Sequence, residues 1–138
     1  GSGKIAFEYA RVIRSFNHKI HVIVSKNKSN LKKTLVRKYK IQNEINDFKI
    51  AIQKFPEIDF WIICTSPENL MKNFEIAIRY KIKTLIEKSI LIRSNVLRKK
   101  IWKLKTKELE NLAIAYNRNF YDFIPHLIKI LKKIIQKK

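Results

Sequence analysis

Apolar positions along the chain follow two patterns in turn, helical spacing of three and four residues and short β-branched runs. Helical spacing predicts a helix over residues 4–16, with an apolar stripe made of Ile5, Tyr9, Val12, Ile13 and Phe16. The run 21–24 predicts a short strand. Ser29 is a suitable N-cap for a second helix that continues to about Tyr39.

The alternation continues through the middle of the chain. Residues 41–45 predict a short strand and residues 47–54 a helical turn. Residues 58–64 are almost continuously apolar, as expected of a strand that is buried on both faces. Residues 65–67 then predict a turn, in which Pro67 suits the first position of the helix that follows.

The second half of the chain repeats this pattern. The helix after the turn has an apolar stripe of Leu70 or Met71, Phe74 and Ile78, and residues 83–87 predict the next strand. A lysine-rich helix over residues 93–105 precedes a strand at 112–116. The chain closes on an amphipathic helix with the apolar residues Phe123, Ile124, Leu127, Ile128, Leu131, Ile134 and Ile135. Strands that alternate with helices predict an α/β fold, a Rossmann-like doubly wound parallel sheet in a single domain of residues 1–138.

Composition agrees with one globular domain and favours the cytoplasm. The chain has 138 residues, of which 46% are hydrophobic, enough for a core. No stretch approaches the roughly 18 apolar residues of a membrane span, and the opening residues do not have the pattern of a signal peptide. Cys64 is the single cysteine, so no intrachain disulfide is expected.

The charge raises a second class of function. The 31 basic and 11 acidic residues give a net charge of +20, which favours nucleic acid or an anionic membrane as a partner. The basic residues are 24 lysines and only 7 arginines, whereas base and phosphate recognition favours the arginine fork. Lysine, isoleucine and asparagine share A/T-rich codons, so genome composition is the alternative explanation of the charge.

The first six residues have the pattern Gly-x-Gly-x-x-Ala, made by Gly1, Gly3 and Ala6, at the start of the first predicted helix. This pattern allows a tight turn, lets the backbone approach a pyrophosphate and offers it a helix N-terminus. The fingerprint requires a strand before it, and none precedes Gly1 in this sequence. The alternative is a linker or cloning remnant.

The residues after the first predicted strand bear on cofactor choice. The acidic residue that binds the ribose hydroxyls of NAD, about 20 positions after the glycines, is replaced by the segment Ser25, Lys26, Asn27, Lys28. A hydroxyl and ammonium groups suit a 2′-phosphate, so NADP is favoured over NAD. The alternative interpretation of this segment is an ordinary solvated loop rich in lysine.

Four short segments follow one another in an order that is typical of one enzyme family. They are the glycine turn, a strand ending in Thr-Ser-Pro, a strand ending in Glu-Lys and a Tyr-Asn-Arg-Asn-Phe segment, at residues 1–6, 59–67, 87–89 and 115–120. Together they resemble the N-terminal Rossmann domain of the glucose–fructose oxidoreductase / inositol dehydrogenase (Gfo/Idh/MocA) family, over nearly the whole chain.

The resemblance implies roles for two of these segments. Glu87 and Lys88 would lie by the nicotinamide, with Lys88 as the candidate catalytic residue, and Thr65 and Pro67 would line the cofactor. The alternatives are a surface ion pair at a strand end and a helix-capping turn. The full set of predicted cofactor-binding residues is Gly1, Ser2, Gly3, Lys4, Ile5, Ser25, Lys26, Thr65, Ser66, Pro67, Glu87 and Lys88.

Three features depart from the family pattern. Ser89 stands in place of a proline, no strand precedes Gly1, and no substrate domain follows Lys138. The family's acid/base histidine is not matched, so the histidines of this chain are expected to be structural or exposed: His18, His21 and His126. We therefore expect a domain truncated at both ends that binds cofactor weakly, does not turn over substrate alone and oligomerises only with the second domain.

The favoured function is therefore the nicotinamide-dinucleotide-binding domain of an oxidoreductase that acts on a sugar or nucleotide-sugar alcohol. A polyanion-binding module and a gene remnant without function are the alternatives. Three histidines and one cysteine do not form a zinc spacing, and the sequence has no P-loop or Gly-x-Ser-x-Gly elbow. No metal is expected.

Overall fold

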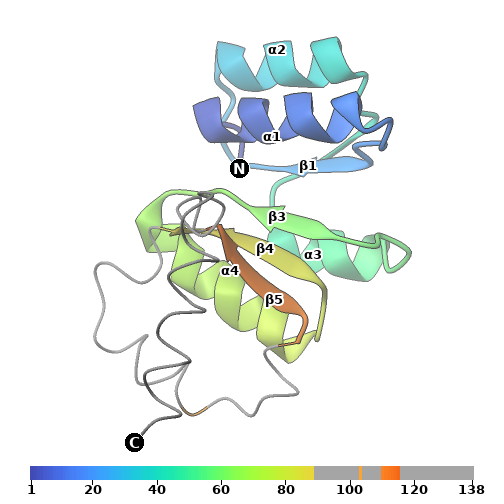
Figure 1. The fold of residues 1–138 in the computed structure, drawn as a ribbon. Helices are drawn as coiled ribbons and strands as arrows, with labels where there is room; N and C mark the ends of the chain where they lie inside the picture. Colours follow the sequence, from blue (N-terminus) through green and yellow to red (C-terminus); the bar gives the residue numbers. More distant parts are fainter. Residues whose placement is uncertain (89–102, 104–109, 116–138) are drawn as a thin grey trace, which may run out of the picture.

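A computed structural model describes residues 1–88, 103 and 110–115 of the chain. Five parallel strands form two groups (Figure 1): β1 (Val22–Val24) pairs with β2 (Asn43–Ile45), and β4 (Thr84–Glu87) lies between β3 (Trp61–Ile63) and β5 (Leu112–Ala115). The four described helices are α1 (Lys4–Ser15), α2 (Asn30–Tyr39), α3 (Phe48–Lys54) and α4 (Pro67–Arg79). Each bound lies within a few residues of the sequence prediction.

Helices α1 and α2 pack together on one face of β1 (Figure 1). Ala10 of α1, Leu35 of α2 and Ile23 of β1 are all buried there. Phe7 and Tyr39 join the two helices through an edge-to-face ring contact of 5.7 Å between centroids. Small alanines on α1 let the helix approach the strand closely, so this face needs little side-chain volume.

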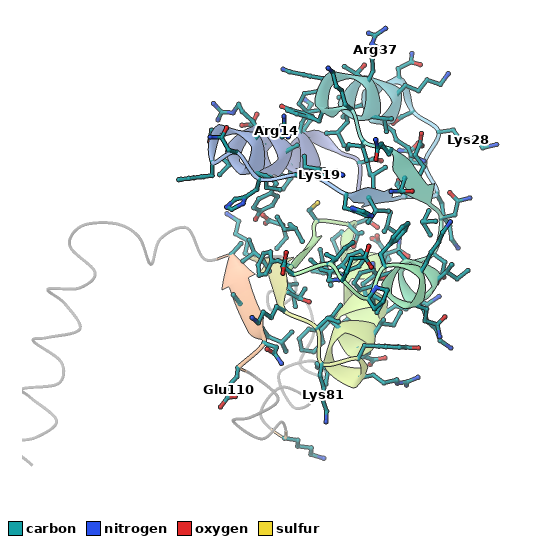
Figure 2. The ribbon with its side chains drawn as sticks, turned by 90° about the vertical axis from the view of Figure 1, so that its right-hand side faces the viewer. Arg14, Lys19, Lys28, Arg37, Lys81 and Glu110 are labelled. Atoms are coloured by element: carbon teal, nitrogen blue, oxygen red, sulfur yellow. The ribbon has the colours of Figure 1, made fainter. Side chains whose placement is uncertain are left out.

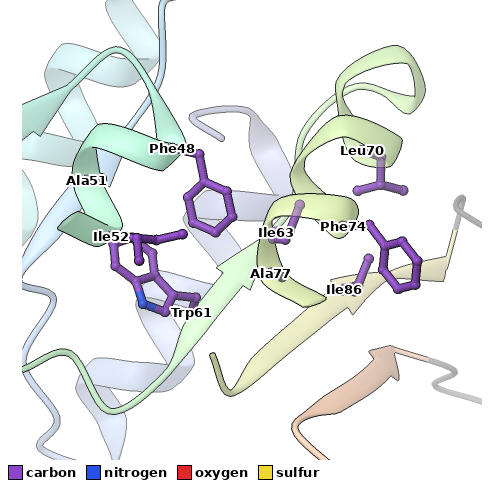
Figure 3. Close-up of a cluster of buried hydrophobic side chains, with 9 residues drawn as sticks. All are labelled: Phe48, Ala51, Ile52, Trp61, Ile63, Leu70, Phe74, Ala77 and Ile86. Carbon is purple, nitrogen blue, oxygen red and sulfur yellow. The ribbon is translucent and has the colours of Figure 1, made fainter. Parts of the chain in front are cut away.

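The larger core lies on the opposite face, under α3 and α4. Its buried residues come from both helices and from β3 and β4, and are Phe48, Ala51, Ile52, Trp61, Ile63, Leu70, Phe74, Ala77 and Ile86 (Figure 3). Val22 and Val24 pack against this cluster from β1, whereas Ile23 between them belongs to the α1–α2 cluster. Since neighbouring strand residues face opposite sides, helices cover both faces and the predicted doubly wound α/β fold is confirmed.

Local sequence explains where the helices begin and end. Ser29 caps α2 by accepting from the Lys32 amide at 3.3 Å, and Asp47 caps α3 by accepting from the Lys49 and Ile50 amides. Pro67 occupies the first turn of α4, as predicted. Lys40 ends α2 in the left-handed conformation, at φ 50°.

The prediction of a strand buried on both faces over residues 58–64 is wrong in its extent. The strand comprises only Trp61–Ile63; Asp59 and Phe60 are exposed, and Ile62 is half-buried. Trp61 and Ile63 are covered by α3 and α4, while Ile62 borders a cavity on the side of β1. One face of this strand therefore packs against α3 and α4, and Ile62 on the other face lines the cavity.

The predicted helix over 93–105, apart from Lys103, and the closing amphipathic helix lie outside the described residues, as do Ser89, Tyr116 and His126. Within the described part, none of the helices has the length and apolarity that a membrane crossing requires.

Candidate functional site

A pocket of about 420 Å³ lies where β1, β2 and β3 end and α1 and α4 begin. We call it the strand-end pocket. Its walls include seven of the residues predicted from sequence, namely Gly1, Ser2, Gly3, Ser25, Lys26, Thr65 and Ser66. In open α/β sheets, ligands bind in the crevice outside the carboxyl ends of the strands. The structure thus brings together three predicted segments at the place where this fold binds ligands.

The two glycines of the first turn differ in their surroundings. A Cβ on Gly1 would overlap the carbonyl oxygen of Cys64, so only glycine fits between β1 and β3 at this point. The Gly1 nitrogen donates to the Val24 carbonyl at 2.9 Å, which fixes the turn against β1. A Cβ on Gly3 would meet no atom within 4 Å, so protein packing does not require glycine there. The space beside Gly3 is open to the pocket.

Helix α1 begins at the pocket without a side-chain cap. Gly3 is its N-cap residue and has no side chain to accept from the first-turn amides. The first amides of a helix carry a partial positive charge and bind anions well. Lys4 and Ile5, both exposed in this first turn, do not line the pocket with their side chains, so their contribution is restricted to the backbone.

Two serines join the glycine turn to the end of β1. Ser2 is 5% exposed, and its Oγ lies 2.8 Å from the Oγ of Ser25. The Ser25 hydroxyl also accepts from the Asn27 amide at 3.2 Å. The Ser25 carbonyl accepts from Lys32 Nζ at 3.2 Å. These three hydrogen bonds fix the position of Ser25, at the start of the loop that follows β1.

The lysines near this loop fall into two groups. Lys32 is buried and ion-paired to Glu44, with 2.9 Å between Nζ and Oε2. Because its charge is already neutralised inside the fold, Lys32 serves to hold β1, α2 and β2 together. Lys26 and Lys28 are exposed, and Lys26 lines the pocket. Their charges are therefore available to an anion in solution.

The turn after β3 supplies a polar atom with no partner. Among the described residues, Thr65 Oγ1 is the buried side-chain polar atom that has no hydrogen-bond partner. It lines the strand-end pocket beside Ser66, whose Oγ accepts from Asn69 Nδ2 at 3.1 Å. A buried polar group left unpaired costs about 1–3 kcal/mol, so a hydrogen bond between Thr65 Oγ1 and a group inside the pocket would be favourable. Pro67 starts α4 and does not line the pocket.

Glu87 and Lys88 lie apart from the strand-end pocket, at the end of β4. Glu87 Oε1 accepts from the Tyr9 hydroxyl of α1 at 2.6 Å. Burial, together with this hydrogen bond to Glu87, raises the pKa of Tyr9 well above its usual value. Glu87 Oε2 accepts from the Lys88 amide at 3.2 Å, and the Lys88 side chain is exposed. Glu87 is thus a fixed acceptor between β4 and α1.

Several pocket residues were not predicted from sequence. Apart from Cys64, they are polar or charged residues that follow β1 and β2 or lie in the first turns of α4. The set comprises Asn27, Asn46, Asp47, Cys64, Asn69, Lys72 and Asn73. Burial raises the pKa of the Cys64 thiol. The position of Asn46 and Asp47 directly after a predicted strand was the available signal, because strand ends meet at one edge of the sheet. Within the described residues, no group of three or more histidine, cysteine, aspartate or glutamate side chains lies close enough together to hold a metal ion.

The predicted structural or exposed positions of two histidines agree with the structure. His18 is exposed after α1. His21 is partly buried and packs edge-on to Phe55 with 5.0 Å between ring centroids, and its Nε2 lies 3.5 Å from Glu57 Oε1. Neither lines the strand-end pocket.

The arrangement of strands, helices and pocket defines a Rossmann-like α/β domain. The chain is similar to the crystal structure of myo-inositol 2-dehydrogenase from Lactobacillus plantarum, with a TM-score of 0.66 and 15% sequence identity. The match covers 96% of this chain and 39% of that chain. At this identity the similarity shows the fold. No protein-family model matches the chain, and no curated protein matches it.

Proposed function

We propose that this chain is the nicotinamide-dinucleotide-binding domain of an oxidoreductase of the Gfo/Idh/MocA type. The observation that carries the proposal is the convergence of Gly3, Ser25 and Thr65 on one pocket at the carboxyl ends of parallel strands. Three segments that are far apart in sequence supply there the features a dinucleotide needs: an approachable backbone, an uncapped helix start and side-chain hydroxyls.

The pocket residues fit a dinucleotide. The open space at Gly3 leaves room for a pyrophosphate against the backbone, and the uncapped first turn of α1 supplies donors. Thr65 Oγ1, buried without a partner, would donate to or accept from the bound cofactor. When bound, the cofactor supplies hydride transfer, and the protein orients it and excludes water.

The same surroundings favour NADP over NAD. At the end of β1, the residue that would contact the adenosine ribose is Ser25, whose hydroxyl already bonds Ser2 and Asn27. The next residue, Lys26, is exposed and adds an ammonium group to the pocket wall. A 2′-phosphate gains from this charge, whereas a free 2′-hydroxyl has no carboxylate partner at Ser25.

Glu87 and Lys88 are proposed to act beyond the strand-end pocket, at the reacting end of the cofactor. Lys88 projects from the end of β4 as an exposed ammonium group and is the proposed catalytic residue. The solved relative is named for its action on myo-inositol, which suggests a sugar or other polyol as substrate. Because the chain spans 39% of that protein, these 138 residues alone are expected to bind cofactor without turning over substrate.

The test uses two substitutions at Gly3. Gly3→Asp and Gly3→Ser both place a good N-cap residue at the start of α1, so both should keep the fold. Asp also puts a negative charge against the pyrophosphate. We expect Gly3→Asp to weaken NADPH binding by at least about tenfold, equal to about 1.4 kcal/mol, and Gly3→Ser to weaken it less. Isothermal titration with NADPH and NADH measures both effects.

The outcomes separate the parts of the proposal. Equal NADPH binding by wild type and the folded Gly3→Asp variant contradicts the placement of the pyrophosphate. Equal affinity for NADPH and NADH contradicts the NADP preference alone. Lys26→Gln should reduce NADPH binding and leave NADH binding unchanged, because it removes one ammonium group without altering a buried contact.

The net charge of +20 favours a second candidate function, binding to a polyanion. Figure 2 shows the basic side chains around the described molecule, and the labelled Arg14, Lys28, Arg37 and Lys81 lie at widely separated places on it. Within the part of the chain that the structure describes, a charge dispersed in this way gives weak attraction without a defined track for a nucleic acid. Polyanion binding should fall steeply between about 50 and 200 mM salt, so a salt-resistant NADPH affinity separates the two functions.

A further inference from the structure

The charge of the described residues is divided unequally between the two helical layers of the fold. Residues 1–40, which form α1, β1 and α2, contain eleven basic residues and one acidic residue, Glu8. Residues 41–88, which form β2, α3, β3, α4 and β4, contain seven basic and seven acidic residues. Since α1 and α2 pack on the face opposite to α3 and α4, one face of the described molecule is strongly basic and the opposite face is neutral.

Genome composition does not explain this division. A/T-rich codons favour isoleucine and asparagine as well as lysine, and such a bias acts on the whole gene. Residues 1–40 contain four isoleucines and three asparagines, whereas residues 41–88 contain eleven and four. The segment with more of these two residues is therefore the electrically neutral one. Codon bias can raise the lysine content of the chain, but it does not place the surplus of basic residues in one layer.

Most of the charge in residues 1–40 faces the solvent. Ten of the eleven basic residues are exposed, and the eleventh, Lys32, is buried and paired with Glu44. Glu8 neutralises Arg11, with 2.8 Å between Oε2 and Nη2, and the sequence of this segment has no other acidic residue. We call the exposed surface of residues 1–40 the basic face. A surplus of one sign on one face gives a local positive potential, which attracts anions.

Large apolar side chains are exposed in the same layer. Phe16, at the end of α1, is 70% exposed, and Ile5 and Val12 of α1 are 50% and 46% exposed. Because these three residues are seven and four positions apart, they lie on one side of α1. Leu31, in the first turn of α2, is also exposed. Basic residues beside exposed apolar side chains on a helix are typical of a surface that lies against a membrane interface.

A bilayer surface fits the basic face better than a nucleic acid does. The basic residues are spread over two helices and the adjoining loops, and Arg14, Lys28 and Arg37 lie well apart around α1 and α2 (Figure 2). Eight of the eleven are lysines, which act as point charges towards many headgroups, whereas arginine is favoured for bidentate contacts to a single phosphate or base. The exposed ring of Phe16 gains from burial at the boundary between headgroups and acyl chains.

We propose that the basic face binds the surface of bilayers that contain anionic phospholipids, with Phe16 inserted among the headgroups. The attraction is electrostatic and is spread over many lysines, so it requires neither a pocket nor one particular headgroup. The neutral face formed by α3 and α4 stays in solution. This inference is independent of the proposed cofactor, because it rests on the charge and the apolar residues of the basic face and not on the strand-end pocket.

The first experiment measures sedimentation of the full chain with sucrose-loaded vesicles of phosphatidylcholine, alone or in an equimolar mixture with phosphatidylglycerol. We expect binding to the mixed vesicles that falls by at least about tenfold between about 0.05 and 0.3 M salt, because the screening length shortens. Pure phosphatidylcholine should not bind the chain. Equal binding to both vesicles, or no binding to the mixed vesicles, overturns the proposal. Tighter binding to a duplex DNA than to the mixed vesicles, at equal phosphate concentration, overturns the choice of a bilayer.

Two double variants locate the binding surface. Lys33→Glu with Arg37→Glu alters α2, whereas Lys49→Glu with Arg79→Glu makes the same change of net charge on α3 and α4, also at exposed residues. Arg37 and Arg79 both lie in the last turn of their helices, so they are matched in their effect on the helix dipole. We expect the α2 variant to bind mixed vesicles at least about tenfold more weakly than the other. Equal weakening would show that total charge determines binding, and it overturns the proposal.

A pair of single variants tests the insertion of Phe16. Phe16→Ser should weaken binding to the mixed vesicles by roughly fivefold, because it removes an apolar ring from the headgroup boundary. Ile50→Ser is the matched control, since Ile50 of α3 is 55% exposed on the neutral face, and it should leave binding unchanged. Equal effects contradict the insertion of Phe16. Circular dichroism checks the fold of each variant, and the comparison of the two kinds of vesicle with the unaltered chain does not depend on any variant.

Discussion

At the scale of single residues, the strand-end pocket depends on a few atoms whose surroundings are set by residues distant in the sequence. Gly1 is required because the Cys64 carbonyl lies where its Cβ would be. Thr65 Oγ1, in the same region, is buried without a hydrogen-bond partner. Lys32, one of 24 lysines, is buried and paired with Glu44, whereas Lys26 stays exposed. Residue type alone does not distinguish these two lysines.

Cys64 gives a direct measure of this pocket, because it is the single cysteine and lines both the strand-end pocket and the cavity between β1 and β3. Burial raises its pKa, which lowers the fraction of reactive thiolate. We expect alkylation by iodoacetamide at pH 8 to be at least about tenfold slower in the folded chain than in urea. Saturating NADPH should slow it further. A folded-state rate equal to the unfolded rate contradicts the described burial, and the rate in urea with NADPH is the control.

The bond between Tyr9 and Glu87 connects α1 with β4 across the sheet. Tyr9→Phe removes a hydrogen bond to a carboxylate and should lower the free energy of unfolding by about 1–2 kcal/mol. The folded-state pKa of Tyr9 is raised, so this contribution is complete below about pH 10 and declines as the pH rises further. Urea denaturation at pH 7 measures the loss.

Tyr39→Phe is the matched control for Tyr9→Phe. Its ring contact with Phe7 remains after the substitution, so the expected change is within about 0.5 kcal/mol. Equal losses for the two variants would show that the Tyr9 hydroxyl does not bind Glu87 in solution.

At the scale of helices and strands, the boundaries follow from short-range chemistry. Ser29, Asp47 and Pro67 begin three helices as their residue types predict. The helix ends are different, because both glycines of the chain lie at its start. Lys40 and Lys81 therefore take the left-handed conformation, at φ 50° and 53°, where glycine is usual.

The left-handed end of α2 can be tested by a lysine-to-glycine substitution, which should raise the free energy of unfolding at Lys40 and lower it at Lys33. Lys40→Gly removes the Cβ that opposes the left-handed conformation and should raise the free energy of unfolding by about 0.5–1 kcal/mol. Lys33→Gly, at an exposed position inside α2, should lower it by about 1 kcal/mol. Urea denaturation of both variants measures the pair. A loss of stability in Lys40→Gly would contradict the left-handed end of α2.

At the scale of the whole molecule, the dominant quantity is the net charge of +20. Exposed ion pairs such as Arg11 with Glu8 contribute little, so mutual repulsion of the basic residues outweighs them. This repulsion opposes the compact state and is reduced by salt, with a screening length of about 10 Å at 0.1 M.

We therefore expect the thermal midpoint to rise by about 3–6 °C between low salt and 0.3 M sodium chloride, which is equivalent to about 1 kcal/mol. Differential scanning calorimetry measures the shift. Potassium chloride should act like sodium chloride, since screening depends on ionic strength. A midpoint that falls with salt would mean that attractive ion pairs exceed the repulsion.

Within the described residues, the sequence by itself determined the order of helices and strands, the Ser29 cap of α2, the start of α4 at Pro67, and the α/β class of the fold. These features depend on residues within about four positions of each other, whose periodicity and capping chemistry can be read along the chain. The three segments that meet at the strand-end pocket were also predicted, because strand ends share one edge of a parallel sheet.

Only the tertiary structure decided how distant segments meet. It separated β1 and β2 from β3, β4 and β5 by a cavity between β1 and β3, joined Glu87 to Tyr9 rather than to the pocket, and buried Lys32 against Glu44. Each of these contacts depends on strand order and register, which bring together residues that are far apart in the chain. Local preferences do not contain that information, because many arrangements of the same elements satisfy them equally.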